Sequence, residues 1–259
     1  MRKISIALSA FCVVFATTAL AERFPLQKAV DVPQNDFGGK VYDVLGIYPG
    51  QSPEDAKAIF IKIYDEKGVE ETEQRFGTRE LQTEPFAKEI KGRKGGRYAD
   101  QASATFGSPT IGGQVIRVSR GVEMDPEKPR PTLEEMANQL IQKYGEPGKR
   151  VNEPGAMYLT WYRGGEEKCA SLDRDLCKVS GGYEIDHYEA YKKEANLPFD
   201  VLISASIYDT PRANDGKVMR FSVSVVDVKR RAISAAEDEK QFEAKLESFR
   251  NQTGQMPEL

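Results

Sequence analysis

Two amphipathic helices, each followed by segments of alternating hydrophobicity, constrain the fold of this chain most strongly. The first helix is predicted to begin at Ser52 and the second at Thr132. Each starting residue has a side chain suited to capping, with an acidic residue three positions later, which is the capping-box pattern. Apolar residues then recur at intervals of three and four, as on one helix face. Gly68 and Gly145 are the expected stops.

Segments in which apolar and polar residues alternate indicate β-strands with one buried face. They are residues 98–106 and 114–122 after the first helix, and residues 157–163, 201–207 and 219–225 after the second. The amphipathic helix that precedes each group is the expected cover for its buried face.

The sequence therefore predicts an α+β fold built as a tandem of two modules. Each module is an amphipathic helix packed on an antiparallel sheet. The first module is assigned to residues 22–125 and the second to residues 131–259, joined by a linker that contains three prolines. The pattern leaves open whether the two sheets merge into one.

A last helix is predicted from about residue 231 to residue 250. It places Phe242, Leu246 and Phe249 on one side. We expect this apolar side to dock across the second module.

The first 21 residues have the pattern of a cleavable export signal. Arg2 and Lys3 precede an uncharged, mostly apolar run from residue 4 to residue 20, and Ala19-Leu20-Ala21 forms a small-residue cleavage site. An uncleaved membrane anchor is the alternative, but the Ser and Thr content and the small-residue end favour cleavage after Ala21. A lipid anchor on Cys12 is disfavoured because bulky Phe11 precedes it.

Export predicts a periplasmic protein that is soluble and not integral to the membrane, because no later segment is long and apolar enough to span a bilayer. Removal of Arg2 and Lys3 changes the formal net charge from −3 to −5. A mildly acidic chain argues against nucleic acid as a partner.

Two cysteines, Cys169 and Cys177, remain after cleavage. In an oxidising compartment, a pair this close is most simply a disulfide that closes a small loop. A redox or metal-binding pair is the alternative, but the Cys-x-x-Cys spacing and a second pair are both missing. The cysteines lie in a long polar insertion, residues 164–198.

Two short windows resemble exported bacterial envelope proteins. One is Gly46-Ile47-Tyr48-Pro49-Gly50-Gln51-Ser52-x-x-Asp55-Ala56, where a polar cap starts a helix, and the other is the helix ending Tyr144-Gly145-Glu146-Pro147. These windows are similar to the SmpA/OmlA outer-membrane lipoproteins and to the beta-lactamase inhibitor protein, a tandem of helix-plus-sheet modules. The resemblance implies a binding or assembly role in the envelope. The lipoprotein cysteine is missing here.

Catalytic motifs are missing from the sequence. The single histidine, His187, lies beside Asp186, but neighbours on a strand point to opposite faces, so no catalytic pair is predicted. One histidine cannot supply the common zinc ligand sets, and no nucleophile elbow, phosphate loop or dinucleotide fingerprint is present. No metal or cofactor is therefore expected. A hydrolase with two carboxylates distant in sequence remains an alternative, since such a pair leaves no motif.

A cluster of basic residues forms a local positive patch in this acidic chain. With Gly92, Gly95 and Gly96 among them, these residues are predicted to lie on a flexible loop. The patch can attract an anionic envelope surface or an acidic partner, or it can be a solvated charge run. Its members are Lys88, Lys91, Arg93, Lys94 and Arg97.

The insertion is the second candidate surface, because long insertions often carry function. Its candidate contact residues are Tyr183, His187, Tyr188 and Tyr191. Exposed tyrosines are favoured at protein interfaces, whereas local packing of these rings on the second sheet is the alternative. The expected function is thus a periplasmic binding module without catalysis, whose partner is another envelope protein or an anionic envelope surface. An envelope hydrolase and a structural spacer are the alternatives.

Overall fold

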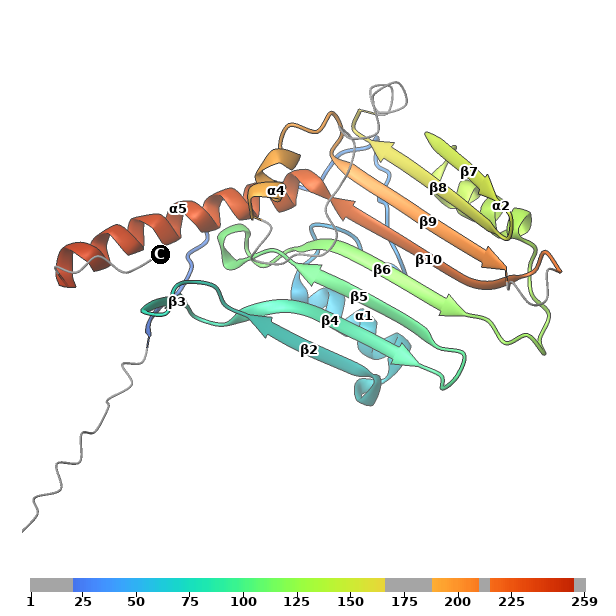
Figure 1. The fold of residues 1–259 in the computed structure, drawn as a ribbon, viewed down its shortest axis with the longest axis horizontal. Helices are drawn as coiled ribbons and strands as arrows, with labels where there is room; N and C mark the ends of the chain where they lie inside the picture. Colours follow the sequence, from blue (N-terminus) through green and yellow to red (C-terminus); the bar gives the residue numbers. More distant parts are fainter. Residues whose placement is uncertain (1–20, 166–187, 210–214, 254–259) are drawn as a thin grey trace, which may run out of the picture.

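A single antiparallel sheet of eight strands dominates the computed structural model, which describes residues 21–165, 188–209 and 215–253 (Figure 1). The strand order across the sheet is β2-β4-β5-β6-β10-β9-β8-β7. In chain order the strands are β2 (Val69–Gln74), β4 (Phe86–Lys94), β5 (Asp100–Phe106), β6 (Val115–Glu123), β7 (Lys149–Glu153), β8 (Ala156–Arg163), β9 (Val201–Asp209) and β10 (Val218–Asp227).

Both predicted capped helices are confirmed, as α1 (Pro53–Tyr64) and α2 (Leu133–Tyr144). The Thr132 hydroxyl accepts from the Glu135 amide, and the Glu135 carboxylate accepts from the Thr132 amide, so this capping box is complete. The first helix ends before Gly68, which lies instead in a 3-10 turn, η1 (Glu66–Gly68). Asp65 ends α1 because its φ of 60° leaves the helical region.

One continuous apolar core lies between the sheet and these two helices. Helix α1 packs on β4, and α2 packs on β8 and β9, both on the rear face of the sheet in Figure 1. Phe60 and Tyr64 of α1 and Leu140 and Tyr144 of α2 belong to the same buried cluster. Trp161 of β8 is fully buried there and donates to the carbonyl of Gly145, 2.6 Å away.

The α+β class is confirmed, whereas the layout as a tandem of two modules is not. A helix followed by four strands of the large sheet occurs twice along the chain. The two strand groups merge because β6 pairs with β10, with Ser119 opposite Ser224. The boundaries at residues 22–125 and 131–259 therefore remain predictions.

The last helix, α5 (Val228–Thr253), is confirmed, and its start at Val228 packs on Val226 and Phe199 of the second half, but its apolar side docks elsewhere than predicted. Phe242, Leu246 and Phe249 pack into a cluster with apolar residues from the first half of the chain, which include Phe76 and Leu81. This cluster surrounds a small parallel pair, β1 (Glu22–Phe24) and β3 (Leu81–Thr83). The C-terminal helix thus fastens the two halves of the chain together.

The start of α5 and the short helix α4 (Tyr188–Glu194) lie at one end of the other sheet face (Figure 1). Tyr191 and Ala235 pack there with Ile116 of β6, and Val228 packs with Val226 of β10. A 3-10 turn, η2 (Pro109–Ile111), contacts α5 beside them. The middle of this sheet face carries no helix within the described ranges.

The described chain joins the fold immediately after the predicted cleavage position. The Glu22 amide donates to the carbonyl of Glu80 at 2.7 Å, and the Glu22 carboxylate pairs with Lys245 of α5 at 2.8 Å. Residues 1–20 lie outside the described residues, so export remains a prediction. Among the described residues, no helix combines the length and the apolar character that a membrane crossing needs.

Candidate functional site

The sheet face opposite α1 and α2 is polar at its centre, and we call it the open face. Strand alternation produces this contrast, since successive side chains point to opposite sides of a sheet. In β9, Ile203, Ala205 and Ile207 are buried under the helices, whereas Ser204 and Ser206 are half-buried on the open face.

A transverse row of polar residues crosses the open face, one from each strand of the sheet. Strand pairing places these residues directly opposite one another. In strand order the row is Glu70, Lys91, Ser103, Ser119, Ser224, Ser204, Thr160 and Lys149.

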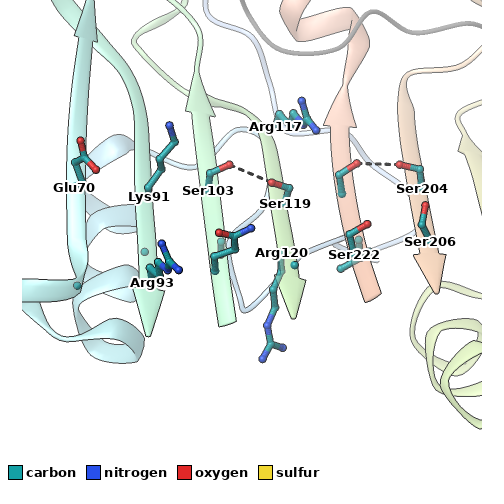
Figure 2. Close-up of a pocket in the computed structure, with 17 residues that line it drawn as sticks. Glu70, Lys91, Arg93, Ser103, Arg117, Ser119, Arg120, Ser204, Ser206 and Ser222 are labelled. Carbon is teal, nitrogen blue, oxygen red and sulfur yellow. Dashed lines mark hydrogen bonds between the residues drawn. The ribbon is translucent and has the colours of Figure 1, made fainter. Parts of the chain in front are cut away.

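Hydroxyl pairs link the centre of this row. The Ser103 and Ser119 hydroxyl oxygens are 3.1 Å apart, and those of Ser204 and Ser224 are 3.0 Å apart. Figure 2 shows the first pair on β5 and β6 and the second on β10 and β9. In each pair one hydroxyl donates to the other, so a free O–H and several lone pairs remain for a ligand.

The centre of the open face is hollowed, with a volume of about 600 Å³. We call this space the serine hollow, because short side chains form its floor, namely Ser103, Ser119, Ser204, Ser206, Ser222, Ser224 and Gly121. Longer side chains flank this floor, and a hollow of this volume is within the range of small-ligand sites.

Three cationic side chains flank the serine hollow (Figure 2). Lys91 and Arg93 stand on β4 at one side, and Arg117 stands on β6. The Lys91 ammonium lies 3.0 Å from the Glu89 carboxylate, which raises the pKa of Lys91 through that hydrogen bond and its charge.

Arg117 is the most buried of these three cations. Burial and the nearby charge of Arg231 lower the pKa of Arg117, and the charge of Glu89 only partly opposes this effect. Its Nε is buried and has no hydrogen-bond partner among the described residues. Because Arg117 lines the hollow, an anion that entered it would be attracted by this guanidinium charge.

Arg120 also lines the serine hollow, but its guanidinium group is bound elsewhere. Its Nε and terminal nitrogen donate to Asp100 at 3.0 and 2.8 Å, and the Tyr64 hydroxyl donates to the same carboxylate at 3.1 Å. In Figure 2 this side chain points away from the serine row. Arg120 therefore has a structural role.

A second hollow of about 840 Å³ lies at the strand ends beside the first. Tyr158 of β8 lines this second hollow and pairs directly with Ser206 of β9, which lines the serine hollow. The rings of Tyr158 and Tyr208 meet edge to face, with centroids 5.8 Å apart, and the Arg220 guanidinium stands 4.9 Å from the Tyr208 ring. This end of the open face offers aromatic contacts that the serine hollow lacks.

The predicted basic patch divides between different surfaces, and the prediction of a flexible loop is wrong. Lys88, Lys91, Arg93 and Lys94 lie in strand β4, where alternation turns only Lys91 and Arg93 toward the serine hollow. Lys94 lies 5.6 Å from the Tyr64 ring on the helix side. Arg97 lies in the following turn and lines the second hollow.

Gly92 serves packing rather than flexibility. A Cβ atom at this position would stand 2.2 Å from the Tyr64 ring and 2.6 Å from the Phe60 ring. The glycine therefore lets α1 approach β4 closely.

Most of the predicted insertion surface lies outside the described residues. This holds for Cys169, Cys177, Tyr183 and His187 and for the side chain of Tyr188, so the disulfide remains a prediction. Tyr191 lies in α4 and is fully buried. The Arg231 guanidinium stands 4.7 Å from its ring, so this tyrosine supports the fold instead of a contact surface.

Catalytic groups do not converge on the serine hollow within the described chain. Glu70 is the one carboxylate among its lining residues, so the hollow lacks a carboxylate pair. Residues 21–165, 188–209 and 215–253 contain no group of three His, Cys, Asp or Glu side chains that could hold a metal ion.

Comparison with protein-family models, with curated proteins and with solved structures finds no match to this chain. The arrangement of side chains on the open face is therefore the basis for assigning a function.

The serine row was not predicted, although the sequence contains a signal for it. Serines occupy the positions that alternate with buried aliphatic residues in the two strands β9 and β10. The sequence could not predict that Ser103 and Ser119 lie beside these serines, because the pairing of β6 with β10 brings together strands that are distant in the sequence.

Proposed function

We propose that this chain is an exported, periplasmic binding protein that acts without catalysis and receives its ligand on the open face. The proposal rests on the serine hollow. A polar hollow of about 600 Å³ at the centre of a regular sheet has no evident use in folding.

Rigidity of the site supports a binding role. The hollow is lined by neighbouring strands in continuous antiparallel pairing, and the reverse side of the same strands packs on α1 and α2. Sites built on regular elements hold their groups more precisely than sites on loops. A preformed site reduces the entropy that is lost on binding.

A pair of tryptophan variants tests whether the open face captures a ligand. In Ser119→Trp, a large ring would occupy the centre of the serine hollow. In Gln139→Trp, the same ring would stand on the exposed surface of α2, on the opposite side of the sheet. The mature chain and both variants are incubated with envelope extract, and the retained molecules are identified by mass spectrometry.

We expect one molecule to be retained by the mature chain and by Gln139→Trp but lost from Ser119→Trp. Thermal unfolding of both variants checks that the fold is intact. Retention of the same molecules by all three proteins would show that the open face is not the binding site.

A further inference from the structure

The lining of the serine hollow indicates which chemical class of ligand it would accept. Cores of protein–protein interfaces are rich in aromatic residues, methionine and arginine and poor in serine and lysine. The floor of this hollow is instead made of serine, with Gly121 and the amide of Gln101. This composition favours a small, strongly polar ligand over a protein surface.

The hydroxyl pairs suit a ligand that has several hydroxyl groups of its own. A serine hydroxyl both donates and accepts a hydrogen bond, and so does a sugar hydroxyl. The Ser103–Ser119 and Ser204–Ser224 pairs stand side by side across four adjacent strands. Adjacent strands are about 4.8 Å apart, so the row offers a regular series of such groups.

The cations indicate that the ligand also carries negative charge. Lys91 and Arg93 stand on β4 at one side of the serines, and Arg117 stands on β6 (Figure 2). Glu70 and Glu89 compensate this charge only in part, and the buried Nε of Arg117 has no partner among the residues described. A phosphate or carboxylate group in the hollow would be attracted to these charges.

We propose that the serine hollow binds an acidic saccharide, a sugar unit or short sugar chain that carries phosphate or carboxylate groups. The serine pairs hydrogen-bond the sugar hydroxyls, and Arg117 with Lys91 and Arg93 holds the acidic groups. This inference rests on the proposed function, since it names the ligand class of the same site.

Calorimetric titration of the mature chain with defined probes tests this inference. The probes are a trisaccharide of galacturonic acid for carboxylates, glucose 6-phosphate for a phosphate, maltotriose as a neutral sugar, and inorganic phosphate as an anion without a sugar. We expect at least one of the two acidic sugars to bind about tenfold or more tightly than both maltotriose and phosphate. Its affinity should fall as salt is added.

Single charge variants locate the binding of the favoured probe. Arg117→Gln and, as an exposed second variant, Arg93→Gln should each weaken binding by about three- to tenfold. Glu89→Gln should strengthen it, because this change removes an opposing carboxylate. Lys62→Gln removes one positive charge from the exposed surface of α1, behind the sheet, and should leave the affinity unchanged.

Equal binding of acidic and neutral sugars would overturn the inference, as would equal binding of an acidic sugar and phosphate alone. Failure of both acidic sugars to bind would also overturn it. The proposed function would survive these results if the Ser119→Trp variant still lost a molecule from envelope extract. The proposed function would fail only if the mature chain and Ser119→Trp retained the same molecules, so the two failures can be told apart.

Discussion

At the scale of single residues, glycine has two opposite roles in this sheet. Gly92 is buried against α1, where the rings of Phe60 and Tyr64 leave no room for a Cβ atom. Gly121 lies on the open face, where the nearest atom to an added Cβ would be 3.7 Å away on Gln101. The same residue type thus permits close packing on one face and helps to form the hollow on the other.

Gly92→Ala should therefore destabilise the protein, by about 1–3 kcal/mol, since extra atoms in a packed core displace their neighbours. Gly121→Ala is the matched control in a nearby strand, and its free energy of unfolding should be within about 0.5 kcal/mol of the parent value. Denaturant unfolding measures both values. Equal losses in the two variants would contradict the packing role of Gly92.

Asp100 shows how a charge is accommodated beside the core. Burial alone would raise its pKa, but hydrogen bonds from Arg120 and Tyr64 and the charges of Arg120 and Lys94 together outweigh burial, so the pKa of Asp100 is lowered. Burial, and then the charge of the same carboxylate, raise the pKa of the Tyr64 phenol. A carboxyl group whose pKa is lower in the folded state stabilises the fold above its unfolded pKa, and this contribution is lost as the pH falls through the folded value.

Asp100→Asn should therefore lower the free energy of unfolding at pH 7 by about 1–3 kcal/mol, because charged hydrogen bonds are lost. The difference from the parent chain should shrink below about pH 4, where this aspartate begins to protonate in the unfolded chain but is still ionised in the folded one. Denaturant unfolding between pH 2 and pH 7 measures both curves. A difference that stays constant over this range would exclude the ionised pair as its cause.

At the scale of elements, helices were easier to predict than strands. Both capped helices begin where their caps predict, because caps and apolar spacing are local signals. The small pair β1 and β3, the short helix α4 and the strands β2, β4 and β7 of the large sheet were missed. The two edge strands β2 and β7 are mostly polar and partly exposed, and β4 contains a run of basic residues. Polar edge strands protect a sheet from unwanted pairing, but they lack the alternation of apolar and polar residues by which a strand is predicted from sequence.

Leu246→Ala should destabilise the protein by about 2–4 kcal/mol, because it leaves a cavity in the cluster that α5 shares with β1 and β3. Glu247→Ala, on the exposed side of the same helix, is the control and should change stability by less than about 0.5 kcal/mol. Thermal and denaturant unfolding compare the two variants. A small effect at Leu246 would mean that α5 does not fasten the two halves.

At the scale of the whole molecule, the two halves of the chain share one apolar core, and two further features join them. The β6–β10 pairing makes one sheet of two strand groups, and α5 from the second half completes a cluster of the first. The open face depends on the first contact, since Ser119 and Ser224 come from different halves. A continuous sheet is therefore a requirement for the serine hollow.

A fragment of residues 22–127 should not fold alone. It would expose the edge of β6 and would lose Leu246 from the cluster around Phe76. Circular dichroism and the dispersion of amide signals in NMR spectra are the measurements. Addition of a fragment of residues 128–259 should restore the spectrum of the intact chain. A well-folded isolated fragment would instead support independent modules.

The sequence by itself determined the α+β class, the two capped helices, the C-terminal helix and the strands that carry clear alternation. These features depend on short-range spacing along the chain, which composition and periodicity record directly. The export signal and the disulfide also come from the sequence, and they remain predictions.

Only the tertiary structure decided that one sheet forms, where α5 docks, and how the basic cluster divides. It also decided that serines from four strands form one hollow. Long-range pairing of β6 with β10 produces the single sheet and the hollow, packing between distant apolar residues places α5, and the assignment of residues 86–94 to a strand divides the basic cluster. No local pattern encodes which strand edge or apolar cluster becomes the partner.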